Sequence, residues 1–108
     1  MVHSERRQHR RYLVEGKAVI RSSSGDFPAQ LVDVGKGGLL LLAGADLVAV
    51  GELVRVRFSI DGYSISIETS GRVARTDTHA IGIAFSEVPA EFDEAILWLE
   101  ASFIATMF

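Results

Sequence analysis

The sequence contains no cysteine, only two prolines and no long hydrophobic run. Without cysteine, the chain can form neither a disulfide framework nor a thiolate metal site. Its longest hydrophobic run, 39–43, has the length of a β-strand and falls far short of the ~18 residues of a membrane-spanning helix. The N-terminus lacks the apolar segment of a secretory signal peptide. We therefore expect a cytoplasmic protein without a membrane span.

The chain has the size of one domain, because 108 residues of which 48% are hydrophobic can bury a core. Its net charge of −3 is unevenly distributed. Residues 1–12 contain four arginines and one glutamate and carry a charge of +3, whereas the rest of the chain carries −6. A basic segment on an acidic domain indicates a localised anion site rather than a general nucleic-acid surface.

Hydrophobic and polar residues alternate along most of the chain, which is the period of β-strands. Between two alternating segments, Asp61-Gly62 predicts a two-residue hairpin with a type I′ turn. After Pro89 the hydrophobic spacing becomes that of an α-helix. The expected strands cover 13–21, 27–34, 38–43, 52–60, 63–70 and 79–86. The sequence therefore predicts a mainly β fold, a small barrel or sandwich, on which a C-terminal helix packs.

We expect this single domain to have three parts. They are an arginine-rich N-terminal arm over 1–12, a β-domain over 13–88 and a helix over 89–108. The end of the chain, 103–108, is unusually apolar for a terminus. It is expected either to pack on the β-domain or to form a contact with a partner or a second copy in a homodimer.

Two segments far apart in sequence carry the residues that suit ligand binding: Arg6-Arg7-Gln8-His9-Arg10-Arg11 and Asp33-Val34-Gly35-Lys36-Gly37-Gly38. If the first hairpin turns near Ser24-Gly25, residue 12 lies opposite about residue 36, and residue 13 opposite about residue 35. The arginine arm is therefore expected to emerge beside the glycine loop. A register error of one or two residues would not separate the two segments.

The residue types at this corner favour a guanine nucleotide. Arginine presents a planar set of donors that binds phosphate and stacks on bases. Glycines allow a backbone to approach a ligand closely, and successive amides can bind an anion. Asp33 would accept hydrogen bonds from the N1–H and N2–H₂ groups of guanine. Taken singly, however, the arm is also typical of a solvated tail, and the Asp-x-Gly-x-x-Gly segment of a simple turn.

These motifs resemble those of the PilZ domain family, which comprises bacterial receptors of cyclic di-GMP. The family pattern is Arg-x-x-x-Arg, preceded by another arginine, followed some twenty residues later by Asp/Asn-x-Ser-x-x-Gly. Here Arg7 and Arg11 match the first motif with Arg6 before them, and Asp33 and Gly38 match the second. The segment from Gly71-Arg72-Val73 to Gly82-Ile83-Ala84-Phe85 is similar to the family's late strands. The resemblance covers nearly the whole chain and implies a six-stranded antiparallel β-barrel with a C-terminal α-helix.

One position departs from the family pattern: Gly35 stands where the family has serine. The serine hydroxyl would contribute one hydrogen bond to the ligand, worth about 0.5–1.5 kcal/mol, or about two- to tenfold in affinity. A second frame of the arginine motif, Arg6-x-x-x-Arg10, also exists. The family spacing favours Arg7 and Arg11 as the phosphate pair, but the sequence leaves this choice open.

The resemblance implies a regulatory module that binds cyclic di-GMP, acts on an effector protein, needs no cofactor or metal and is not an enzyme. We expect Arg7 and Arg11 to bind phosphate and stack on a guanine, Arg6 and Arg10 to add charge, and Asp33 to bind the guanine edge. The backbone at Gly35 and Gly38 would lie close to the ligand. Two alternatives remain open: a PilZ-fold adaptor that no longer binds the nucleotide, and nonspecific nucleic-acid binding by the arm. The three histidines have no metal-ligand spacing, and the Gly-Lys at 35–36 lacks the Ser or Thr of a phosphate-binding P-loop.

Overall fold

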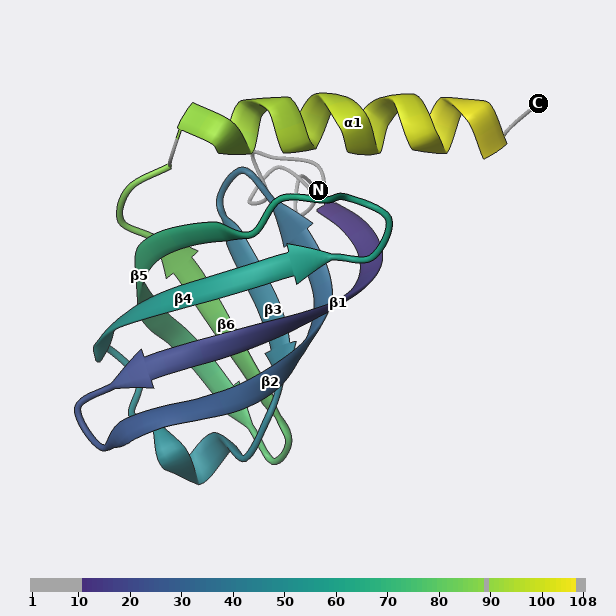
Figure 1. The fold of residues 1–108 in the computed structure, drawn as a ribbon. Helices are drawn as coiled ribbons and strands as arrows, with labels where there is room; N and C mark the ends of the chain where they lie inside the picture. Colours follow the sequence, from purple (N-terminus) through teal and green to yellow (C-terminus); the bar gives the residue numbers. More distant parts are fainter. Residues whose placement is uncertain (1–10, 89, 107–108) are drawn as a thin grey trace, which may run out of the picture.

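The computed structural model of the chain describes residues 11–88 and 90–106, except for the side chains of residues 45 and 103–106. Its strands are β1 (Arg11–Ser22), β2 (Gly25–Gly35), β3 (Gly38–Leu42), β4 (Leu53–Ile60), β5 (Ile67–Asp77) and β6 (Ala80–Phe85). A short 3-10 helix (Ala45–Leu47) precedes β4, and the α-helix α1 (Ala90–Thr106) ends the described chain. The mainly β fold with a C-terminal helix is confirmed (Figure 1).

The six strands form a closed antiparallel barrel in the order β1-β2-β3-β6-β5-β4. Pairing of β1 with β4 closes the sheet, so that no edge is left open. The expected alternation holds well in β4, where Val54, Val56, Phe58 and Ile60 are buried between exposed or partly exposed neighbours. The inward residues of all six strands form one hydrophobic core.

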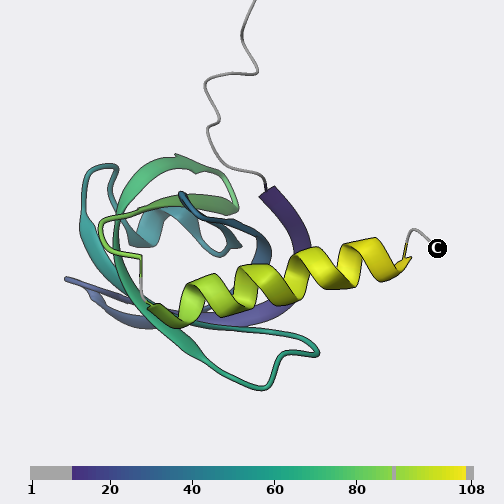
Figure 2. The same ribbon diagram turned by 90° about the horizontal axis from the view of Figure 1, so that it is seen from above.

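Helix α1 lies across one end of the barrel (Figures 1 and 2). Phe92 is fully buried and packs edge-on against Phe58 and Phe85, with ring centroids 6.2 and 5.3 Å apart. Glu91 and Asp93 in the first turn favour the positive end of the helix dipole. The helix thus closes the core at the end where β1 begins. The apolar segment 103–108, for which a dimer contact was one expectation, lies outside the described side chains.

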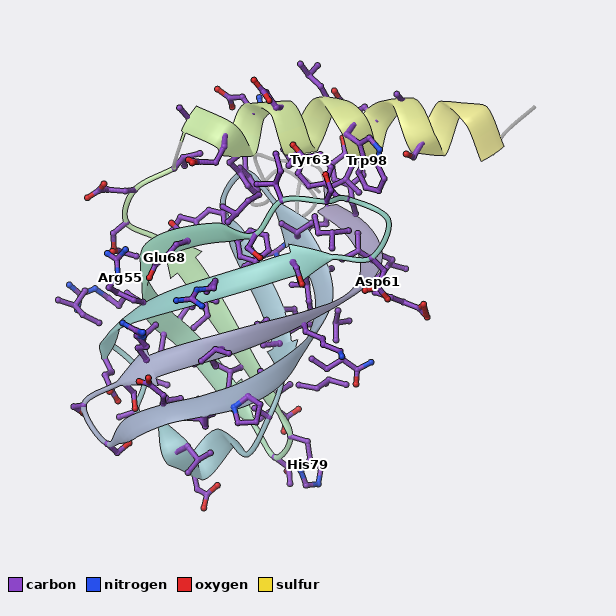
Figure 3. All side chains as sticks on the ribbon, in the orientation of Figure 1. Arg55, Asp61, Tyr63, Glu68, His79 and Trp98 are labelled. Carbon is purple, nitrogen blue, oxygen red and sulfur yellow. The ribbon has the colours of Figure 1, made fainter. Side chains whose placement is uncertain are left out.

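The predicted two-residue hairpin at Asp61-Gly62 is wrong. Phe58 pairs with Ile67, so β5 begins four residues later than expected, and 63–66 form no strand. A type I′ turn needs positive φ at both central residues, but of these two only Gly62 has it, at +90°. The Tyr63 ring instead packs on that of Trp98 in α1, with ring centroids 5.1 Å apart (Figure 3).

The first hairpin has a different register from the expected one. Its turn is Ser23-Ser24, with Ser22 paired to Gly25, which has φ of +124°. A bulge between Leu13 and Gly16 shifts the pairing further. Arg11 therefore lies opposite Gly35, and Leu13 opposite Asp33. The difference of two residues leaves the end of the arm beside the glycine loop, as expected.

Candidate functional site

Arg11 and Asp33 form the centre of the candidate site. Arg11 is the first residue of β1, and Asp33 lies on the neighbouring strand β2, two residue pairs away from the Arg11–Gly35 pair. Nη1 of Arg11 donates a hydrogen bond to Oδ1 of Asp33 across 2.8 Å. The two side chains are 29% and 15% exposed. The two charged motif residues that the structure describes are therefore in direct contact at the barrel surface.

This ion pair uses only some of the polar atoms of the two side chains. The guanidinium of Arg11 keeps further N–H donors, and within 11–88 and 90–106 no donor bonds to Oδ2 of Asp33. Each group also fixes the orientation of the other. The corner can thus offer donors to a phosphate or a base and a carboxylate oxygen to an N–H edge without first being rearranged.

The two motif glycines lie beside this pair. Gly35 and Gly38 face one another across the turn Lys36-Gly37, and Gly35 also faces Arg11. Both glycines are buried. A Cβ atom at Gly38 would collide with the carbonyl oxygen of Ile83 on β6, so only glycine fits there. The absence of a side chain at Gly38 therefore lets β3 approach β6.

Gly35 has an ordinary backbone conformation. Among the described glycines, only Gly25, Gly51 and Gly62 have positive φ. Serine at position 35 would therefore meet no backbone strain of the left-handed kind. The backbone conformation at Gly35 therefore does not itself exclude serine.

The structure brings together Arg11, Asp33, Gly35 and Gly38 of the expected site. Arg6, Arg7 and Arg10 lie outside the described residues. Tyr12, which follows Arg11, is buried and donates from its hydroxyl to Oε2 of Glu100 in α1 across 3.1 Å. The site is thus joined to the C-terminal helix through one side chain next to Arg11, a connection that the sequence analysis did not predict.

Arg75 was not among the predicted site residues, yet it lines a small recess of about 80 Å³ together with Arg11 and Gly37. Gly71 and Val73 are buried on the inner face of β5, so strict alternation would place residue 75 inside as well. A bulge between Val73 and Arg75 turns Arg75 outward. The sequence contains one indication of this bulge: a charged arginine stands where the alternation of β5 would place a buried residue.

The remaining candidates lie away from this corner or form no site. His79 is exposed in the β5–β6 turn, at the end of the barrel opposite α1 (Figure 3). In the described part of the chain, no group of three or more His, Asp or Glu side chains could hold a metal ion. No described helix combines the length and hydropathy needed to cross a membrane.

Solved structures of other proteins share the fold of this chain. MotI/DgrA, the inhibitor of motility of Bacillus subtilis, has a TM-score of 0.75 and 18% identity over 93% of this chain and 52% of its own. An uncharacterized Legionella protein has a TM-score of 0.60 and 13% identity, covering 92% of this chain and 99% of its own. The PlzA protein of Borreliella burgdorferi, solved in complex with cyclic di-GMP, has a TM-score of 0.58 and 23% identity over 80% of this chain and 37% of its own.

The chain spans about half the length of MotI/DgrA and little more than a third of PlzA. A comparison with curated protein sequences found no match. The sequence pattern of the PilZ domain, in contrast, matches residues 5–100, nearly the whole chain. This range includes the arginine segment, the glycine loop, the complete barrel and most of α1. The chain belongs to the PilZ domain family.

Proposed function

We propose that this PilZ domain is a cytoplasmic bacterial module that binds cyclic di-GMP and passes the signal to an effector protein. The observation that carries the proposal is the contact of Arg11 with Asp33 beside the buried glycines 35 and 38. A cation and a carboxylate beside a glycine loop at one corner match the phosphate and the guanine edge of such a ligand. The PilZ neighbour PlzA, solved with cyclic di-GMP, supports the same ligand class.

Each residue has a defined role in this proposal. Arg11 donates to a phosphate and orients Asp33, whose carboxylate accepts from guanine N1–H and N2–H₂. Arg7 provides the second half of the phosphate clamp, and Arg6 and Arg10 add positive charge. Gly35 and Gly38 allow the ligand to approach the backbone. In this proposal, the contacts that the arginine arm makes with the ligand are the switch.

A structural change caused by ligand binding can reach α1 through Tyr12. This buried residue follows Arg11 and holds Glu100 of the helix by a hydrogen bond of 3.1 Å. A ligand that shifts the first residues of β1 would therefore change the contact between the barrel and the helix. We propose that an effector protein binds the surface altered in this way. The role is binding and not catalysis, since we assign no nucleophile or general base to this corner.

A second candidate function is an adaptor that keeps the fold but no longer binds the nucleotide. Gly35 favours it, because this residue lacks the hydroxyl that the family's serine would offer. The Arg11–Asp33 contact also favours it in part, because each charge already has a partner. We rank this function second, since one absent hydrogen bond accounts for only about two- to tenfold in affinity.

Isothermal titration calorimetry separates the two functions. The complete chain is titrated with cyclic di-GMP at tens of micromolar protein, with GTP and GMP as controls. The receptor function predicts saturable heat for cyclic di-GMP and much weaker binding of both controls. Absence of heat with cyclic di-GMP would leave the adaptor as the better account.

A further inference from the structure

A row of outward-facing residues runs from Asp33 across the barrel to Arg75. Asp33 pairs with Leu40 on β3, Leu40 with Gly82 on β6, and Gly82 with Arg75 on β5. Their sequence neighbours Val34, Leu39 and Ile83 are buried in the core, so the row itself faces outward. At about 4.8 Å between strands, Arg75 lies about 14 Å from Asp33 along the surface.

The surface at the Arg75 end of this row contains a recess. A recess of about 380 Å³ lies beyond Gly82 and is lined by Leu40, Arg75, Thr76, Asp77, Ala80 and Gly82. The smaller recess beside Arg11 shares Leu40, Arg75 and Gly82 with it. A Cβ atom at Gly82 would lie 3.0 Å from Cγ and 3.2 Å from Nε of Arg75. The absent side chain at Gly82 thus makes room for Arg75 to lie across β6, between the two recesses.

Arg75 is the available cation on this part of β5. Its guanidinium forms no hydrogen bond or ion pair with any of residues 11–88 and 90–106. Arg72, three positions earlier, donates instead to the carbonyl oxygen of Gly51 across 2.6 Å. Asp77 uses Oδ1 to accept from the amide of Thr78 across 2.8 Å, which leaves its other oxygen for a ligand.

The lining of the larger recess suits a guanine base. Guanine has acceptors at O6 and N7, which arginine binds with two parallel donors. Its N1–H and N2–H₂ groups need an acceptor, and Asp77 provides a carboxylate, as Asp33 does in the first site. Leu40 and Ala80 add apolar surface for the face of the ring. The same pair of side-chain types, arginine and aspartate, therefore occurs at both ends of one continuous surface.

We infer that this recess is a second base subsite, in which Arg75 donates to one guanine of cyclic di-GMP and Asp77 accepts from it. The first guanine lies at Asp33, and the ribose–phosphate ring that joins the two bases passes over Leu40 and Gly82. The inference rests on the proposed function, because it concerns the second half of the same ligand.

The test is a set of calorimetric titrations of the complete chain with cyclic di-GMP and with 3′,3′-cyclic GMP-AMP, in which adenine replaces one guanine. The proteins are the wild type, Arg75→Ala, Asp77→Asn and the control Arg57→Ala. Arg57 is an exposed arginine on β4 that lines neither recess. Thermal melting of each protein establishes that the barrel is intact.

We expect Arg75→Ala to weaken cyclic di-GMP binding at least tenfold, roughly the effect of charged hydrogen bonds, and Arg57→Ala to change it less than about twofold. Asp77→Asn should lower the ratio of the affinity for cyclic di-GMP to the affinity for cyclic GMP-AMP. If the wild type binds but Arg75→Ala behaves like Arg57→Ala, the subsite is wrong and the proposed function stands. An unchanged preference in Asp77→Asn would also overturn the guanine subsite. Wild-type protein that binds neither dinucleotide would overturn the proposed function itself.

Discussion

Arg11 and Asp33 stand 22 residues apart in the sequence, yet Nη1 of the first lies 2.8 Å from Oδ1 of the second. The contact joins the first strand to the second at the corner where the glycine loop begins. It holds a carboxylate, which would repel phosphate, next to a cation that attracts it. A ligand with both phosphates and N–H donors can use both groups, whereas a simple polyanion can use only one. The pair therefore favours a nucleotide over bare phosphate.

Arg7 and Arg11 are both expected to contribute to ligand binding, but only Arg11 is expected to contribute to the stability of the fold. Arg7→Ala and Arg11→Ala should each weaken cyclic di-GMP binding at least tenfold, because charged hydrogen bonds contribute roughly 1.5–3 kcal/mol. Arg11→Ala should also lower the free energy of unfolding by up to about 1 kcal/mol through loss of a partly exposed ion pair. Calorimetry and urea unfolding measure the two effects. Arg57→Ala serves as the control for loss of one positive charge.

Unchanged affinity in both Arg7→Ala and Arg11→Ala would contradict the phosphate clamp. Arg11→Lys gives a finer comparison, since lysine keeps the charge but loses the planar set of donors. We expect it to recover only part of the affinity that Arg11→Ala loses. Full recovery would mean that charge alone matters at this position.

Asp33 distinguishes base recognition from nonspecific nucleic-acid binding. Asp33→Ala should weaken cyclic di-GMP binding, because it removes the acceptor of the guanine edge. The same change should strengthen any binding of single-stranded DNA, because it removes a negative charge beside the arm. Fluorescence anisotropy with both ligands at fixed salt measures the two affinities. If both rise together, Asp33 does not bind the base, and nonspecific electrostatic binding gains support.

Gly35→Ser restores the residue of the family pattern. The φ angle at Gly35 is not positive, so serine can adopt its backbone conformation. We expect cyclic di-GMP binding about two- to tenfold tighter, from one added hydrogen bond and a less flexible free loop. Calorimetry of the variant beside the wild type is the measurement. No gain would show that the missing hydroxyl does not limit affinity, and that the loop acts through its backbone or not at all.

Gly38 is expected to be needed for the stability of the fold even when no ligand is present. In Gly38→Ala the new Cβ would collide with the carbonyl oxygen of Ile83, so β3 and β6 would have to separate. Such overpacking destabilises a protein by about 1–3 kcal/mol. Thermal and urea unfolding should show this loss without any ligand present. A variant as stable as the wild type would mean that the strands move apart easily at this point.

Much of the fold follows from the alternation of hydrophobic residues, because alternation reports which face of a strand meets the core. Val54, Val56, Phe58 and Ile60 are one such set, and all four are buried. Registers were harder to predict, because they depend on contacts distant in sequence. Tyr63 meets Trp98 of the helix, and the local turn preference of Asp61-Gly62 does not determine where β5 begins.

Part of the candidate site could be predicted from the sequence for a similar reason. Antiparallel pairing across a short turn brings Arg11 beside Gly35 even with an error of two residues. The position of Arg75 could not be predicted in this way, because it depends on a bulge between Val73 and Arg75. Bulges arise where a barrel bends and closes, and in β5 the only local sign of one is a charged residue where the alternation expects a buried one.

The most direct test of the central claim is a ¹H–¹⁵N NMR titration of the complete chain with cyclic di-GMP. It reports binding and location in one experiment. We expect saturable shifts that are largest at Arg11 and over 33–38, with further shifts at Arg75 and Gly82. A spectrum that does not change would contradict ligand binding. Shifts confined to the distant surface around Arg55 and Arg57 would contradict the site.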